Sequence, residues 1–127
     1  MRLCFGTLAI SPIIRKMDVG EATRLLMRAY EQGVRILDTA EYYDNYALLR
    51  PALAALPDIK VITKSYAFSA KGAAESLRRA REGLGRNHID FFLLHEQESE
   101  HTLRGHAEAT EFYLERKKAG EIGGVGV

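Results

Sequence analysis

Residues 89–95, IDFFLLH, form a mostly apolar run that closes on a histidine. A continuous apolar run of this length predicts a β-strand covered on both faces, as the strands of a parallel sheet are. Residues 59–64, IKVITK, and residues 34–38, VRILD, have the same form and end in a charged residue. A shorter run, LCFGT, precedes them. We therefore expect four strands, over Leu3–Thr7, Val34–Asp38, Ile59–Lys64 and Ile89–His95.

Segments of helical character separate these runs. Asp18 and Glu21 have the spacing of a capping box, an apolar repeat of helical period follows, and Gly33 ends the segment. Pro51 predicts that the second helix is kinked or starts late. Ser69 is expected to cap the third. The expected helices cover residues 18–32, 46–56, 69–84, and a last one from about 103 or 108 to 119.

The strand ends recur at intervals of about 30 residues, the length of one βαβ unit. Strands that alternate with helices indicate an α/β fold with a parallel sheet. We predict a half-barrel of about four βα units, with the start of a fifth strand at Val125–Val127. Since a complete (β/α)-barrel needs about 250 residues, residues 1–127 are interpreted as a single partial domain.

Bulk composition narrows the function classes. The formal net charge is +1, with 46% hydrophobic and 28% charged residues, so neither nucleic acid nor a membrane surface is an expected partner. No apolar stretch approaches the roughly 20 residues that span a bilayer, and the cytoplasm is the expected compartment. The single Cys4 excludes an intrachain disulfide and is expected to be a small buried hydrophobe. It lacks partners at ligand spacing, so no metal site is expected.

Each central strand delivers one ionisable residue at its carboxyl end: Asp38, Lys64 and His95. These ends share one face of a parallel barrel, where active sites lie. Tyr43 follows Asp38 by five residues and would overhang the same face. Near an ammonium, a phenol becomes a stronger acid, so the group could protonate a carbonyl oxygen.

Simpler interpretations stay open for each residue alone. Asp38 could be a helix cap, Lys64 a surface lysine and His95 a core histidine. The tyrosines at positions 42, 46 and 66 are interpreted as packing residues, and the acidic stretch 95–101 as a solvated loop.

The motifs resemble those of the aldo-keto reductases. Asp-Thr-Ala, two variable residues and Tyr appear at 38–43, the lysine closing the third strand at 61–64, and Leu-Leu-His after an Asp-initiated strand at 90–95. Gly-Thr at 6–7 and GEIGGVGV at 120–127 also resemble the family. The matches run in order from end to end and identify the chain as similar to the amino-terminal half of that (β/α)8 barrel.

The resemblance implies roles for the matching residues. Tyr43 would be the general acid, Lys64 would make it more acidic, and Asp38 would pair with Lys64. His95 would orient the carbonyl of a small aldehyde or ketone. The activity implied is reduction by NADPH or NADH, carried out by a complete barrel.

Cofactor contacts are implied for Gly6, Thr7 and Asp38, but most lie in the family's second half, so the isolated chain is not expected to turn over substrate. Departures occur after the tyrosine, where Asp44 and Ala47 replace the usual Gly and Glu, and after the histidine, where Gln97 replaces a common proline. The alternative is an inactive half-barrel that self-associates through exposed strand edges, or serves as an interaction module.

Overall fold

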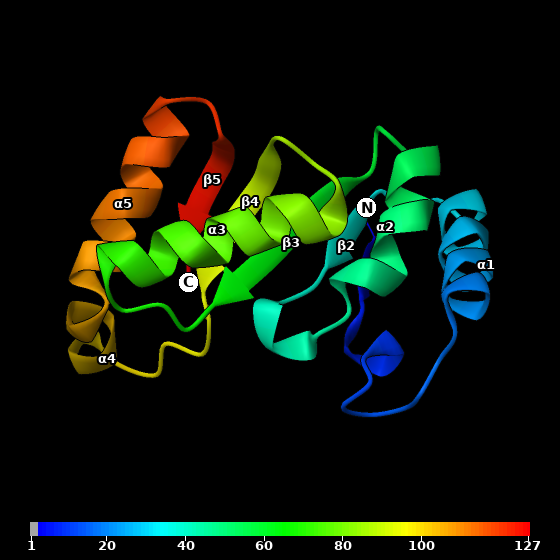
Figure 1. Ribbon diagram of the computed structural model, residues 1–127, viewed down its shortest axis with the longest axis horizontal. Helices are drawn as coiled ribbons and strands as arrows, with labels where there is room; N and C mark the ends of the chain where they lie inside the picture. Colours follow the sequence, from blue (N-terminus) through cyan, green and yellow to red (C-terminus); the bar gives the residue numbers. More distant parts are fainter. Residues whose placement is uncertain (1–2) are drawn as a thin grey trace.

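The computed structural model describes residues 3–127, which form a five-stranded parallel sheet in the order β1-β2-β3-β4-β5 (Figure 1). Neighbours along the sequence are neighbours in the sheet, as successive βα units of a barrel require. This confirms the predicted parallel half-barrel. The strands are β1 (Cys4–Gly6), β2 (Ile36–Asp38), β3 (Lys60–Ser65), β4 (Ile89–Leu94) and β5 (Ile122–Gly126).

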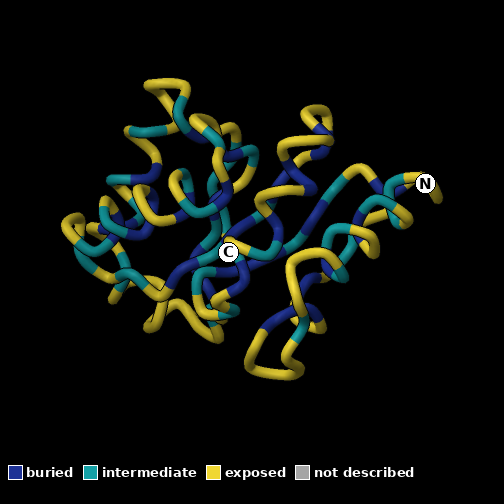
Figure 2. The backbone as a smooth tube through the Cα atoms, turned by 45° about the vertical axis from the view of Figure 1, so that its right-hand side comes forward, coloured by how far each residue is buried: buried dark blue, intermediate teal, exposed yellow. Residues whose placement is uncertain are grey.

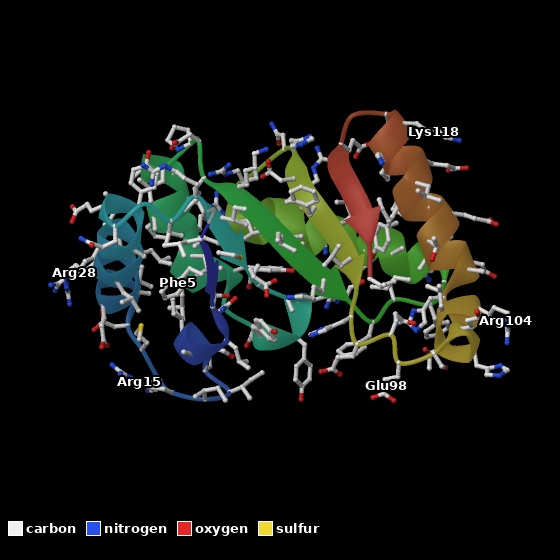
Figure 3. All side chains as sticks on the ribbon, turned by 180° about the vertical axis from the view of Figure 1, so that it is seen from behind. Phe5, Arg15, Arg28, Glu98, Arg104 and Lys118 are labelled. Carbon is white, nitrogen blue, oxygen red and sulfur yellow. The ribbon has the colours of Figure 1, made fainter. Side chains whose placement is uncertain are left out.

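The helices cover one face of the sheet, and the view from behind shows the strands uncovered on the other (Figure 3). We call these the helix face and the open face. The α-helices are α1 (Val19–Glu31), α2 (Tyr46–Ala55), α3 (Ala70–Leu84), α4 (Glu100–Gly105) and α5 (Ala107–Lys118), and the 3₁₀ turns are η1 (Leu8–Ile10) and η2 (Glu41–Tyr43). No described helix is both long enough and apolar enough to cross a membrane.

Helix ends follow the expected caps, with one exception. The Asp18 carboxylate accepts the Glu21 backbone N–H, and the Ser69 hydroxyl accepts that of Gly72. Glu21 does not reach back as a capping box requires, because its carboxylate pairs with Arg15 instead. The expected box is therefore only half formed.

Two expectations about helices were wrong in part. α2, Tyr46–Ala55, matches the expected range 46–56 and continues through Pro51, so of the two expected effects of Pro51 a late start does not occur. The stretch 95–101 is not a simple loop, because Ser99 and Thr102 form a capping box that opens α4. A second helix, α5, then begins at Ala107, close to the later of the two expected starts.

The fifth strand begins at Ile122 rather than Val125, and two glycines explain why apolarity did not reveal it. A Cβ at Gly123 would lie 2.6 Å from the Asp90 carbonyl oxygen, and one at Gly124 would lie 2.6 Å from the Phe91 ring. Both glycines permit close approach to β4, at the cost of the apolar signal that marks the other strands.

Buried residues gather along the central strands (Figure 2). Alternation places Leu37, Val61 and Phe92 in the core beneath the helices. The residues between them face the open side, where Phe91 remains 39% exposed. Cys4 is exposed and not buried as expected, because β1 is an edge strand and Cys4 pairs in register with Ile36 of the open face.

Candidate active site

Asp38 and Lys64 meet on the open face at the carboxyl ends of β2 and β3. The Lys64 Nζ donates to Asp38 Oδ1 at 2.5 Å and to the Thr39 carbonyl oxygen at 2.8 Å. Their side chains are 15% exposed for Lys64 and 33% for Asp38. A charge-assisted pair with a second acceptor fixes the ammonium in position.

Tyr43 lies beside this pair in η2, the turn that follows β2. The Lys64 Nζ is 5.3 Å from the centre of the Tyr43 ring. His95, directly after β4, presents its ring to Tyr43 edge to face, with centroids 5.8 Å apart and an interplanar angle of 74°. The structure therefore brings together Asp38, Tyr43, Lys64 and His95, the four residues that sequence singled out for catalysis.

Tyr42 and Tyr66 do not pack in the core as expected. Tyr42 is 63% exposed and Tyr66 43%, and they contact each other edge to face with centroids 6.1 Å apart. Tyr46 does pack: its hydroxyl bonds to Thr63 at 2.6 Å, and burial raises its pKa. The two exposed tyrosines instead lie beside the cluster, since Tyr42 precedes Tyr43 within η2 and Tyr66 follows the strand that carries Lys64.

The backbone around Tyr43 is held from the first loop. The Ser11 hydroxyl donates to the Tyr43 carbonyl oxygen at 2.5 Å. Asp44 follows with φ 49°, in the left-handed region. Glycine enters that region without a Cβ penalty, which gives a physical reason why glycine suits the position that Asp44 holds here.

Asn45, which sequence reasoning missed, joins the two loops in a buried network. Its Oδ1 accepts from the Thr39 hydroxyl at 2.8 Å, and its Nδ2 donates to the Thr7 carbonyl and hydroxyl oxygens at 3.0 and 3.1 Å. The Thr7 hydroxyl in turn donates to the Asp38 carbonyl oxygen at 3.0 Å. All three side chains are fully buried. The one sequence signal was an asparagine at the start of a helix, where it is common as a cap; here it caps nothing with its side chain.

This network also bears on the expected cofactor contacts. The Thr7 hydroxyl is engaged inside the protein, whereas Gly6 pairs in register with Asp38 on the open face. A Cβ at Gly6 would meet nothing within 4 Å. The flat, unobstructed surface at Gly6, beside the Asp38 carboxylate, is where a planar group could approach the backbone.

His95 is 6% exposed and enclosed by aromatic rings. Tyr66 stacks on it with centroids 4.6 Å apart and an interplanar angle of 21°. Burial, and next the Lys64 ammonium, lower the pKa of His95, so the neutral imidazole is favoured. A neutral imidazole can hydrogen-bond a polar group brought to the open face without carrying charge.

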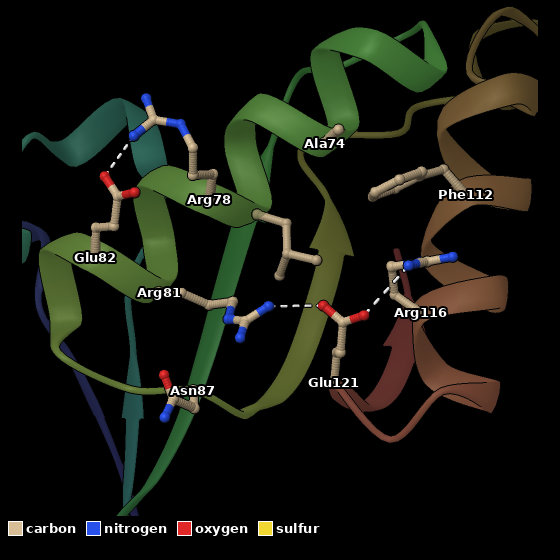
Figure 4. Close-up of a pocket in the computed structure, with 9 residues that line it drawn as sticks. Ala74, Arg78, Arg81, Glu82, Asn87, Phe112, Arg116 and Glu121 are labelled. Carbon is tan, nitrogen blue, oxygen red and sulfur yellow. Dashed lines mark hydrogen bonds and ion pairs between the residues drawn. The ribbon is translucent and has the colours of Figure 1, made fainter.

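A second hollow lies away from this site, in a groove of about 340 Å³ between α3 and α5 (Figure 4). Glu121 bridges Arg81 at 2.6 Å and Arg116 at 3.2 Å across it. Leu77 and Phe112 line the remainder. Glu121 precedes β5, so the groove is at the opposite end of the strands from Asp38, Lys64 and His95, and its ion pairs join one helix to the next.

Comparison with known proteins agrees with the geometry. A sequence model of the aldo/keto reductase family matches residues 2–127. An aldo-keto reductase of Mycolicibacterium paratuberculosis is 29% identical over 120 residues, covering 90% of this chain and 41% of the relative. The solved holo form of an aldo-keto reductase from Bacillus halodurans superposes with a TM-score of 0.83 at 24% identity, covering 98% of this chain and 45% of that one.

A Gox0644 variant, solved in complex with NADPH, gives a TM-score of 0.77 at 21% identity, with 97% and 43% of the two chains covered. The chain thus spans less than half the length of these relatives. With the parallel sheet, the strand-end cluster and the family match over residues 2–127 in agreement, this chain belongs to the aldo/keto reductase family.

Proposed function

We propose that this chain supplies the proton-donating half of an NAD(P)H-dependent reductase of aldehydes and ketones, with Tyr43 as the general acid. The observation that carries the proposal is the position of the Lys64 ammonium, 5.3 Å from the Tyr43 ring centre and 2.5 Å from Asp38 Oδ1. A phenol is a weak acid at neutral pH. A fixed ammonium favours the phenolate and so makes the phenol a better proton donor.

The other residues have distinct tasks in this proposal. Asp38 holds the Lys64 ammonium in place. His95, held neutral, donates a hydrogen bond to the carbonyl oxygen and orients the substrate against Tyr43. When the alkoxide develops, Tyr43 transfers its proton to that oxygen, and the ammonium stabilises the charge left on the phenolate.

The residues present fit a nicotinamide cofactor. Gly6 offers a surface without a side chain on the open face, and Asp38 lies in register beside it. These two would contact the cofactor, which supplies hydride when bound. The NADPH complex of a structural neighbour supports NADPH as the first candidate, with NADH as the alternative.

We further propose that residues 1–127 are one partial domain that acts only within a complete barrel. The chain matches 41% of the length of the Mycolicibacterium paratuberculosis relative and 45% of the Bacillus halodurans structure, and the open face leaves Phe91 39% exposed. The remaining βα units of a barrel would cover this face. In their absence, the uncovered face and the edge strands β1 and β5 give the isolated chain a route to self-association.

The test joins this chain to the complementary half of the Mycolicibacterium paratuberculosis relative and follows NADPH oxidation with a small aldehyde. Tyr43→Phe should lower kcat by about 10²–10⁴-fold, the usual contribution of a positioned acid, while the cofactor Kd stays unchanged. Tyr42→Phe, the neighbouring and exposed tyrosine, is the matched control and should retain near-native kcat. Loss of activity in Tyr42→Phe but not in Tyr43→Phe would overturn the assignment.

A further inference from the structure

The imidazole of His95 is not oriented by a hydrogen bond at Nδ1 within the described part of the chain. Its Nδ1 is buried and has no hydrogen-bond partner within residues 3–127. A histidine ring is normally oriented by the partner of one of its nitrogens. The orientation of this ring must therefore come from the groups packed against it.

Tyr66 makes the closest of these contacts. Its ring is stacked on His95 at 4.6 Å, whereas Tyr43 approaches from another side, edge on, at 5.8 Å. Tyr66 directly follows β3 and His95 directly follows β4, and the His95 N–H donates to the Ser65 carbonyl oxygen at 2.9 Å. The two rings are thus joined through adjacent, hydrogen-bonded strand ends.

Tyr66 is itself anchored, although it is 43% exposed. Its hydroxyl donates to the carboxylate of Glu96, the residue after His95. That hydrogen bond raises the pKa of Tyr66 to about 12, so the phenol stays protonated and the bond persists through neutral pH. An exposed ring held at its far end can keep the stacked geometry.

The backbone of Glu96 is adapted to this contact. Its φ is 53°, in the left-handed region that a residue with a Cβ adopts only at a cost. The Gln97 side-chain amide donates to the His95 carbonyl oxygen at 3.0 Å and steadies the same turn. From this turn the Glu96 carboxylate accepts the hydrogen bond of the Tyr66 hydroxyl.

We propose that Tyr66 and Glu96 are positioning residues that clamp the His95 imidazole in the orientation used to bind a substrate carbonyl. Neither residue needs to touch the reacting atoms. Tyr66 excludes water from one face of the imidazole and blocks rotation of the ring, and Glu96 holds Tyr66 in place. The role of the clamp in substrate binding rests on the proposed function. That Tyr66 and Glu96 hold the His95 ring does not depend on it.

The charged and titratable groups around the imidazole determine whether each substitution should raise or lower the pKa of His95. Lys64 lowers the pKa of His95, Glu96 and Asp38 raise it, and burial has the largest effect, downward. Tyr43 and Tyr66 are the phenols in contact with the ring. Exposing the ring to water should therefore raise the pKa of His95, and removing the Glu96 charge should lower it.

The experiment is an NMR titration of the His95 imidazole in the 127-residue chain. Tyr66→Leu removes the stack and should raise the pKa of His95 clearly. Tyr66→Phe keeps the stack without the anchor and should raise it less. Glu96→Gln removes the charge but keeps an acceptor for the Tyr66 hydroxyl, and should lower it.

The control is Tyr30→Phe, because the Tyr30 hydroxyl also donates to a carboxylate, that of Asp58, at 2.9 Å. It should leave His95 unchanged. In the joined barrel, Tyr66→Leu should raise KM by up to about tenfold, because the substrate carbonyl loses one oriented hydrogen bond, with a smaller change in kcat.

An unchanged pKa of His95 in every Tyr66 variant that folds would overturn the clamp. If Tyr66→Leu unfolds, the conservative Tyr66→Phe decides the test. Failure of the proposed function would show differently, as absence of carbonyl reduction by the unmutated barrel while the NMR shifts occur as expected.

Discussion

Two charged clusters, one at each end of the strands, have similar short-range geometry and different surroundings. Asp38 and Lys64 pair at 2.5 Å on the open face, and Arg81 and Glu121 pair at 2.6 Å between the helices. The ammonium of the first adjoins a phenol and an imidazole, both able to exchange protons. The second adjoins Leu77 and Phe112, and a guanidinium does not deprotonate in proteins.

The difference teaches that a hollow and a set of proton-exchanging side chains need not coincide in this chain. The groove between α3 and α5 is a ready-made concavity, yet its arginines are balanced by carboxylates and join neighbouring βα units. The strand-end cluster lies on the open face, which the rest of a barrel would cover in the proposed complete enzyme. In a chain that spans part of a barrel, the types of side chain are a better guide to a candidate site than the shape of its surface. The shape depends on the remaining βα units of the barrel.

The contrast between the two clusters would be wrong if removing a cation from either one changed kcat equally. Lys64→Met removes the ammonium beside Tyr43 and should lower kcat of the joined barrel by about 10²-fold or more, because the phenol then donates its proton less readily. Arg81→Met removes a cation from the second cluster, formed by Arg81, Arg116 and Glu121 in the groove between α3 and α5 (the outer cluster). It should leave kcat near the native value. Equal losses in steady-state assays would refute the contrast.

A smaller effect is expected on stability, when an asparagine of the buried network is compared with an exposed asparagine. Asn45→Ala leaves the Thr39 hydroxyl without its buried acceptor and removes both side-chain donations to Thr7, which keeps its bonds to Asp38 and Ile10. The free energy of unfolding should therefore fall by about 2 kcal/mol. Asn87, an exposed residue of the outer groove, gives the matched control: Asn87→Ala should change it by less than about 0.5 kcal/mol. Urea denaturation of the chain measures both. A stable Asn45→Ala would mean that the network does not hold the Tyr43 turn.

The smallest effect is expected in the outer cluster itself. Glu121→Gln weakens two partly exposed ion pairs and should cost about 0.5–1 kcal/mol of unfolding free energy. Because salt screens such pairs, the cost should shrink when denaturation is repeated at about 1 M salt. A salt-independent cost would indicate that Glu121 acts through packing and would blur its distinction from the strand-end pair.

Much of the fold could be predicted from the sequence, because apolar periodicity and helix caps depend on residues close together along the chain. The apolar runs ending at Asp38, Lys64 and His95 located three strands, and Ser69 marked the start of α3. The fifth strand was misplaced because Gly123 and Gly124 serve close approach to β4, a requirement set by another strand. Cys4 was expected to be buried because its neighbours are apolar, but exposure depends on which side of β1 the helices cover.

The candidate site divides in the same way. Spacing alone placed Tyr43 over the strand ends, and the structure puts it beside Lys64 while Tyr42 points to Tyr66. Tyr66 was taken for a packing residue, because nothing in its own segment indicates the carboxylate of Glu96. Asn45 was missed for a similar reason, since its partners lie in two other loops.

The sequence by itself determined the order of the βα units and which ionisable residues lie at the strand ends, since periodicity and caps depend on residues a few positions apart. The alternation of strands with helices also indicated a parallel sheet. Only the tertiary structure decided how those residues meet: the Asp38–Lys64 pair, the stack of Tyr66 on His95, and the Asn45 network between the first and second loops. Each joins segments about 25 to 40 residues apart, and such contacts exist only after the strands have aligned in register.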